Sequence, residues 1–214
     1  MNDHSKTTLP KGTGRISFPE PGTMSPDQRR VYDQIVSGPR GVLVGPLRAA
    51  LHNPTLADRW QRFGQVLRFE TSIPTYLNEL AILVTARRWN SELEWAIHAG
   101  DAARAGLNPA ITDAIRTCDL PDFAGDAAAA EIYEFARQLQ QTGNVADNAY
   151  AAIVARWGEL GAVELTAVIG YYSMVAMTLN VHRVPLPDGM EVDLPATPDR
   201  LARMPHARQT PTEG

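Results

Sequence analysis

Helix-start signals recur along this chain, and they constrain its fold more than any other feature. A proline at the first helical position, particularly after a capping Ser or Asn, marks the beginning of a helix. Such signals occur at Ser25-Pro26, Pro46, Asn53-Pro54, Pro74 and Asn108-Pro109. No segment shows a convincing strand pattern, because the short apolar run at 42–44 is enclosed by glycine and proline. The sequence therefore predicts an all-α fold.

The expected helices follow from these starts and from the breaks between them. Gly38-Pro39 ends the first helix, and Asn90-Ser91 separates two central ones. The expected set spans residues 25–37, a short turn at 46–51, 54–67, 74–88, 91–106, a helix from 109, 127–141, 147–157 and 162–181. Gly- and Pro-rich segments flank them, so we expect an N-terminal arm over 1–24, one helical domain over 25–186 and an extended tail over 187–214.

Two apolar segments indicate how the helices pack. Leu56, Trp60, Phe63 and Leu67 recur at helical spacing and predict a stripe that faces the core. Residues 165–181 carry no formal charge, and their length is near the lower limit for spanning a bilayer. Thr, Gly, Tyr, Ser and Asn interrupt this segment, so we interpret it as a helix buried among other helices, with no membrane partner.

Charge and cysteine content narrow the classes of function. Lys and Arg total 20 against 24 Asp and Glu, and no basic block stands out, so we expect no nucleic-acid partner. Cys118 is the only cysteine, so a cysteine pair within one chain cannot carry a redox cycle. The first twenty-odd residues lack the apolar stretch of a signal peptide, and we expect a cytoplasmic protein.

Ionisable residues in the two central helices are the candidates for chemistry. Glu79 has almost only apolar neighbours in sequence, so it is either a tuned acid or base or a structural acid bonded inside the bundle. Glu94, His98 and Asp101 fall on one helix face, where a carboxylate beside an imidazole forms a proton-transfer pair. Ordinary explanations compete, because Ser91 and Glu94 fit an S-x-x-E capping box and a charged stripe is often solvated.

The sequence predicts no metal site and no nucleotide site. It contains no H-x-x-x-H, H-E-x-x-H or Cys/His cluster with ligand spacing, and Glu94 with His98 supplies too few ligands. It also lacks a G-x-G-x-x-G loop, a Walker loop and a G-x-S-x-G elbow. Acid-base chemistry is what these residues favour.

Several segments between residues 78 and 107 carry a family resemblance. They are Asn78-Glu79-Leu80-Ala81-Ile82-Leu83-Val84, Trp89-Asn90, Glu92-Leu93-Glu94-Trp95-Ala96-Ile97-His98 and Ala105-Gly106-Leu107. Together they resemble the central helical hairpin of the carboxymuconolactone decarboxylase and alkyl hydroperoxidase D superfamily. In the hydroperoxidase branch a glutamate precedes a C-x-x-C pair and a histidine four residues beyond it. Glu79 and His98 match, but Ser91 and Glu94 stand at the cysteine positions, which disfavours dithiol peroxidase chemistry.

The resemblance implies an alkyl hydroperoxidase D-like helical bundle and points to the decarboxylase branch. Members of that branch need no cofactor and remove carbon dioxide from a small carboxylated lactone in aromatic-compound degradation. The implied residues are Glu79, Glu94 and His98 for catalysis, and Arg87, Arg88 and Trp95 for substrate binding. Similar family members assemble as trimers or hexamers, so the resemblance also implies a homo-oligomer.

Two alternatives to the lyase remain open. The same residues could hydrolyse or isomerise another lactone. The chain could also be a non-catalytic helical module for ligand binding or assembly, in which the polar residues only form hydrogen bonds with one another.

A weak internal similarity concerns the architecture, since Glu164 precedes His182 by nearly the spacing between Glu79 and His98. It predicts two related helical halves.

Overall fold

The computed structural model describes residues 14–39, 41–192 and 194–207, which contain eight α-helices and no strand. Residues 1–13 of the expected N-terminal arm, and residues 193 and 208–214 of the expected tail, lie outside the described residues. The helices are α1 (Pro26–Ser37), α2 (Pro46–Ala50), α3 (Pro54–Phe69), α4 (Thr75–Arg88), α5 (Glu92–Arg104), α6 (Pro109–Thr117), α7 (Ala127–Thr142) and α8 (Asp147–His182). The all-α prediction is confirmed.

Capping side chains begin several helices where the sequence predicted them. Ser25 and Gln28 form a reciprocal capping box at the start of α1. Asn53 and Asn108 accept backbone N–H groups in the first turns of α3 and α6. Each cap satisfies a donor that the helix itself leaves unpaired, which stabilises a helix by about 1 kcal/mol.

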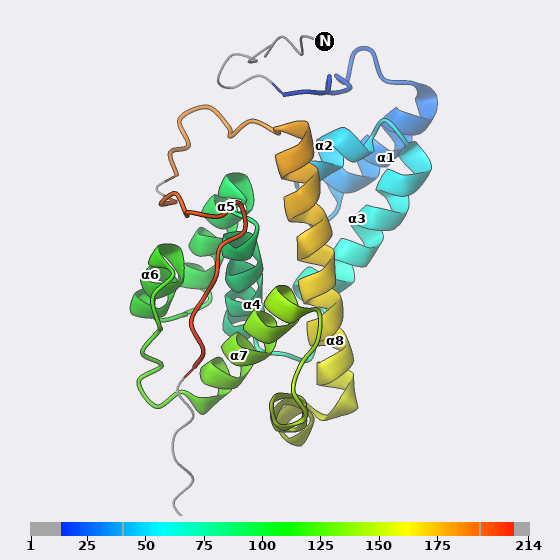
Figure 1. Cartoon of the computed structure of the whole chain (residues 1–214). Helices are drawn as coiled ribbons and strands as arrows, with labels where there is room; N and C mark the ends of the chain where they lie inside the picture. The colour runs from blue at the N-terminus through cyan, green and yellow to red at the C-terminus, as the bar shows by residue number, and fades with distance from the viewer. Residues whose placement is uncertain (1–13, 40, 193, 208–214) are drawn as a thin grey trace, which may run out of the picture.

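Helix α4 lies at the centre of the fold. Every residue from Leu77 to Arg87 is buried, as expected for a helix that is apolar on nearly all sides. It packs most extensively against α5, α7 and α8, and Figure 1 shows it enclosed among them. A short turn at residues 89–91 joins α4 to α5. Polar side chains on α4 therefore need partners within the protein.

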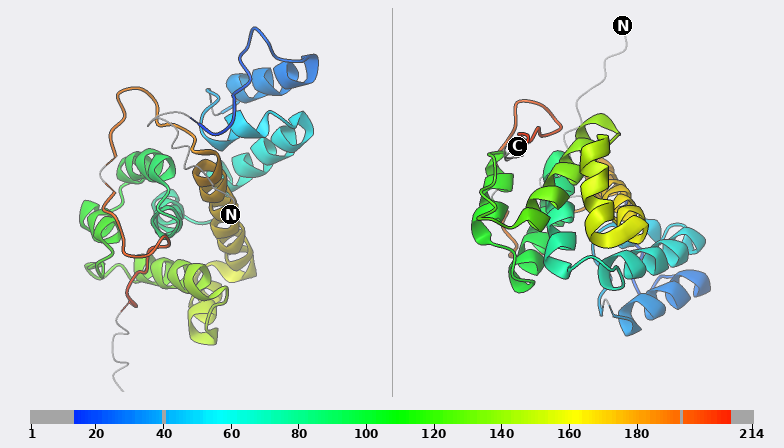
Figure 2. Two further views of the ribbon diagram at one scale, coloured as in Figure 1. Left: turned by 45° about the horizontal axis from the view of Figure 1, so that its top comes forward. Right: turned by 90° about the horizontal axis from the view of Figure 1, so that it is seen from below.

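Helix α8 joins two groups of helices. Figures 1 and 2 show it between α1–α3 on one side and α4–α7 on the other. By length and composition it could cross a membrane, but half of its most apolar window is buried within the protein. It packs against α2, α3, α4, α5 and α7, as the interpretation of residues 165–181 expects. The helices expected at 147–157 and 162–181 form the two parts of α8, which is kinked at Gly158, where the backbone is non-helical.

The predicted core stripe on α3 is only half correct. Trp60 and Leu67 are buried, but Leu56 and Phe63 are 49% and 48% exposed. The prediction is wrong for these two residues because α3 packs mainly against α1, α2 and α8, which leave these side chains uncovered. One of its apolar faces is left uncovered by the described residues.

The described end of the chain forms no helix, and it packs against the bundle. We call residues 194–207, the red end of the trace in Figure 1, the C-terminal strap. Ala202 and Met204 are buried. The Ala202 amide donates to the Arg88 carbonyl at 2.9 Å, and the Tyr133 hydroxyl donates to the Pro205 carbonyl at 2.8 Å. These contacts attach the strap to α4 and α7.

The Glu164 and His182 pair does not reproduce the arrangement of Glu79 and His98. Glu164 and His182 lie on the single helix α8, whereas Glu79 and His98 lie on two helices joined by a turn. The Glu164 carboxylate accepts from the Ser72 amide and hydroxyl at 2.8 and 2.6 Å. Glu164 therefore has a structural role, holding α8 against the loop before α4.

Candidate active site

The α4–α5 hairpin brings Glu79 and His98 together. Nδ1 of His98 lies 2.7 Å from Oε2 of Glu79, and the two side chains are almost completely buried. With Glu79 ionised, Nδ1–H donates to the carboxylate, which fixes the ring orientation and leaves Nε2 as the proton-transferring atom. Among the described residues no hydrogen-bond partner of Nε2 is present. The pair has the geometry of an oriented general base or acid.

Glu94 is a buried carboxyl group without a hydrogen bond. It is 2% exposed, and neither of its oxygens has a hydrogen-bond partner among the described residues. Burial raises the pKa of Glu94 well above its usual value; the nearby Ser91 hydroxyl opposes this shift without reaching hydrogen-bond geometry. A carboxyl group in this setting is held protonated and is available as a proton donor.

The capping-box explanation of Ser91 and Glu94 is wrong. Ser91 is the N-cap of α5 by position, but its side chain makes no capping hydrogen bond. Ser91 is completely buried, and its hydroxyl has no hydrogen-bond partner among the described residues. Because the capping box does not form, the carboxyl group of Glu94 accepts no hydrogen bond from the start of α5 and is available for proton transfer.

A small cavity collects the candidate groups. Its volume is about 50 Å³, enough for one or two water molecules. The lining residues are Val44, Gly45, Pro46, Leu47, Arg68, Leu93, Glu94, Ile97, His98, Tyr171, Tyr172, Val175 and Leu179. Glu94 and His98 thus share one cavity, and Glu79 contacts His98 from outside the lining. The three predicted catalytic residues converge rather than facing different sides of the bundle.

Two groups at the cavity were not predicted from the sequence. Arg68, in the last turn of α3, lines the cavity and forms an ion pair with Asp101, which also contacts Arg104. The ring of Tyr172 meets that of His98 edge to face, with centroids 4.8 Å apart. Burial raises the pKa of Tyr172 well above its usual value, so its hydroxyl stays protonated. Arg68 and Tyr172 reach the cavity because α3 and α8 pack on α5, and this packing could not be read from the sequence.

The predicted substrate-binding residues lie elsewhere. Arg87 is fully buried and donates to the Pro195 carbonyl at 2.9 Å, while Arg88 donates to the Ala202 carbonyl at 2.8 Å. Both residues hold the C-terminal strap instead of facing the cavity. Trp95 is buried in the apolar core around α4 and is absent from the cavity lining. Arg68 is the cation that the structure brings to the cavity.

Glu79, His98 and Asp101 also lie close enough together to be considered as ligands of a metal ion. One ligand atom from each lies within 4.8 Å of the others. However, Glu79 and His98 already bond to each other, and Asp101 already pairs with Arg68 and Arg104. A divalent cation would have to displace these contacts and lie close to a guanidinium group. The arrangement suits proton transfer better than metal ligation.

Sequence comparison finds no relatives. No protein-family model matches the chain, and no curated protein matches its sequence.

Comparison with solved structures does find similar folds. An uncharacterized peroxidase-related protein from Ralstonia eutropha JMP134, described as an alkylhydroperoxidase AhpD core, is 12% identical with a TM-score of 0.65, covering 82% of this chain and 93% of its own. A peroxidase-related protein from Silicibacter sp. TM1040 is also 12% identical, with a TM-score of 0.67 and coverages of 85% and 96%. The debrominase Bmp8 in complex with 2,3,4-tribromopyrrole is 16% identical, with a TM-score of 0.64 and coverages of 81% and 91%. At these identities the similarity concerns architecture alone, and the chain has the helical fold of the alkylhydroperoxidase AhpD core.

Proposed function

We propose that this protein is a cofactor-independent lyase of the carboxymuconolactone decarboxylase type, which removes carbon dioxide from a small carboxylated lactone. One observation carries the proposal. The buried, unpaired carboxyl group of Glu94 and the imidazole of His98 line the same cavity, and Glu79 orients the imidazole. An acid beside an oriented imidazole is what proton transfer to a substrate carbon requires.

The reaction needs one proton for each molecule of carbon dioxide released. Breaking the bond between the ring carbon and the carboxylate carbon leaves an electron pair, which the conjugated lactone carbonyl delocalises. Glu94 delivers a proton to that carbon, and His98 restores the proton of Glu94 from water through Nε2. The environment that keeps Glu94 protonated thus prepares the acid before the substrate arrives.

Arg68 supplies the positive charge that such a substrate needs. In the free protein its guanidinium pairs with Asp101. Because Arg104 also pairs with Asp101, that carboxylate keeps a partner when Arg68 turns to the substrate. The guanidinium then stabilises the substrate carboxylate on binding and the enolate charge as carbon dioxide leaves.

Substrate entry requires the cavity to open. A volume of about 50 Å³ admits water but not a carboxylated ring. One wall is the segment that leads into α2, which lies between Gly41 and Gly45, both with positive φ. Val44 in this segment is 39% exposed. We propose that the cavity opens by movement of this segment, whose glycines allow large changes of backbone angle.

The test is carbon dioxide release from carboxymuconolactone by the purified full-length chain. We expect wild type to release it, and Glu94→Gln and His98→Ala to lower kcat by about 100-fold or more. Glu92→Gln is the matched control, because Glu92 is exposed in the same turn of α5 and should keep the wild-type rate. The proposal fails if wild type releases no carbon dioxide, or if the Glu94 and His98 variants match it.

The same assay distinguishes the other functions. Opening or rearrangement of the lactone without carbon dioxide would assign a hydrolase or isomerase that uses the same groups. A protein that binds the lactone and leaves it unchanged would be a ligand-binding module. We further propose a cytoplasmic homo-oligomer, a trimer or hexamer, supported by the uncovered apolar side chains of α3 and α8.

A further inference from the structure

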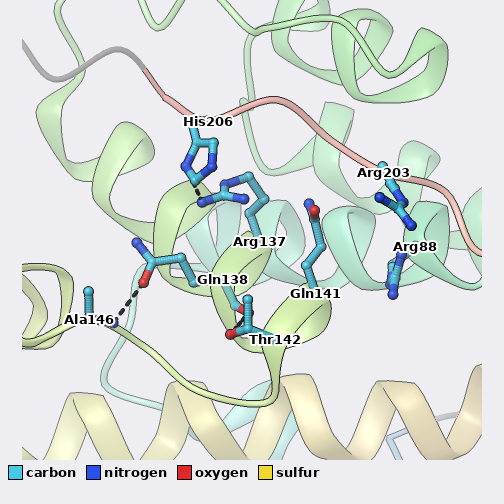
Figure 3. A pocket seen from close by; sticks show the side chains of 8 residues that line it. All are labelled: Arg88, Arg137, Gln138, Gln141, Thr142, Ala146, Arg203 and His206. Carbon is cyan, nitrogen blue, oxygen red and sulfur yellow. Dashed lines mark hydrogen bonds between the residues drawn. The ribbon is translucent and has the colours of Figure 1, made fainter.

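A second hollow, of about 500 Å³, lies where α4 and α7 meet the C-terminal strap. It shares no lining residue with the cavity of Glu94 and His98. Arg88 from α4, Arg137 from α7, and Arg203 and His206 from the strap line it. Figure 3 shows Arg203 extending from the strap toward Arg88, with Arg137 beside His206. Its size is in the range of sites that bind small molecules.

The positive groups are fixed in place by other contacts. Arg88 donates through Nε to the Gln140 carbonyl and through Nη1 to the Ala202 carbonyl, at 3.2 and 2.8 Å. Arg137 is buried and forms a two-bond ion pair with Glu134 at 2.9 and 2.6 Å. These bonds hold two guanidinium groups in defined orientations at the wall of the hollow. A ligand would therefore meet prearranged donors.

Several donors in the hollow remain unused. Within the described residues, Nη2 of Arg88, Nη1 of Arg137 and both terminal nitrogens of Arg203 make no hydrogen bond. Arg203 pairs with Asp199, whose carboxylate lies 3.6 Å from its Nε atom. Unpaired guanidinium donors from three parts of the chain, directed at one space, are suited to the oxygens of carboxylates and phosphates.

Glu134 and Asp199 offset part of this positive charge, but among the described residues neither forms an ion pair with Arg88. Although burial acts to raise it, hydrogen bonds from Arg137, Gln138 and the Ala207 amide hold the pKa of Glu134 at about 2. Glu134 is thus ionised and already saturated with donors. Burial and the positive charge of Arg203 both lower the pKa of Arg88. The fold therefore keeps Arg88 and Arg203 together despite their repulsion, which a bound anion would relieve.

We propose that this hollow is a binding site for a small organic polyanion, one with two or more carboxylate or phosphate groups, held by Arg88, Arg137 and Arg203. Two anionic groups would let one ligand reach Arg88 and Arg203 at one end of the hollow and Arg137 at the other (Figure 3). Since two of the lining residues belong to the strap, the ligand also fixes the strap on the bundle. This site is independent of the lyase proposal.

The experiment is calorimetric titration of the full-length chain, at low ionic strength, with citrate and with pyrophosphate as probes. We expect at least one probe to bind saturably with one molecule per chain. Binding of citrate alone would assign carboxylates, and binding of pyrophosphate alone would assign phosphates. Arg203→Gln should weaken binding about tenfold or more. Arg203 is 79% exposed, so this variant leaves the packing of the strap intact.

Arg29→Gln is the matched control. Arg29 is an exposed arginine that pairs with an aspartate four residues away, as Arg203 does, but it lies in α1. It should bind the probe as wild type does. The bound probe should also slow hydrogen exchange of the Ala202 amide, which bonds to Arg88. Absence of saturable binding, or equal affinity in wild type and Arg203→Gln, would overturn the proposal, as would equal losses in both variants.

Discussion

Glu94 is a carboxyl group that the folded protein removes from water and leaves without a hydrogen bond. Because burial raises its pKa, ionising it opposes folding. The free energy of unfolding is therefore highest below the ordinary carboxyl pKa, where Glu94 is neutral in both the folded and the unfolded state. It falls as pH rises toward the pKa of Glu94 in the folded state. Glu94→Gln removes this pH-dependent loss of stability, because an amide does not ionise. We expect the variant to gain up to about 1.4 kcal/mol per pH unit over wild type within that window.

Urea unfolding of both proteins at about pH 5 and about pH 8 measures this difference. Glu92→Gln, an exposed change in the same turn, should leave the pH dependence of wild type unaltered. A Glu94→Gln variant with the same pH dependence as wild type would show that Glu94 is ionised in the folded state.

Individual site residues were predictable to different degrees. Glu79 and His98 were each candidates from their local sequence, but only the family resemblance linked the two, because spacing along two different helices does not predict a contact. Asp101 was visible from the helical spacing after His98. Its partner Arg68 lies 33 residues earlier in the chain, and only the packing of α3 on α5 brings the two together. The S-x-x-E pattern misled because it fits a capping box in spacing alone, and the structure makes neither of the two bonds of the box.

Gly158 has a non-helical backbone within α8, with φ 70° and ψ −177°. A Cβ atom is disfavoured in this conformation, so Gly158→Ala should destabilise the protein by about 1–3 kcal/mol. Gly170 is the matched control, because it is helical in the same element and an added Cβ would meet nothing within 4 Å. Gly170→Ala should instead stabilise by about 0.5–1 kcal/mol. Chemical denaturation measures both, and equal effects would contradict this account of the kink.

Helix starts were predicted well because proline and the capping side chains act within a few residues. The break expected after residue 157 was also correct, because the backbone of Gly158 leaves helical geometry and kinks α8 there. Glycine adopts the positive φ of this kink at little steric cost, so this break too has a local cause.

At the scale of the whole molecule, the helical class was predictable from composition and helix starts. The packing of the strap was not. Proline-rich composition predicted an extended tail, but it gave no information about the surface that receives it. That surface includes Arg87, Arg88 and Tyr133, all more than 60 residues before their partners in the strap. The same contacts explain why the two arginines do not reach the cavity of Glu94 and His98.

Uncovered apolar side chains suggest that the chain assembles with copies of itself. They lie mainly on α3 and α8, two helices that contact each other: Leu56, Phe63, Val66, Phe69, Leu160, Val163, Met174, Met177 and Val181. Monomeric proteins seldom expose large apolar patches. We expect light scattering to give the mass of a trimer or hexamer for wild type. Val66→Lys, which places a charge among the uncovered side chains of α3, should shift the protein toward the monomer. Val42→Lys is the control, because Val42 is similarly exposed but outside both helices. A monomeric wild type would rule out this assembly, and the apolar face would then need another partner.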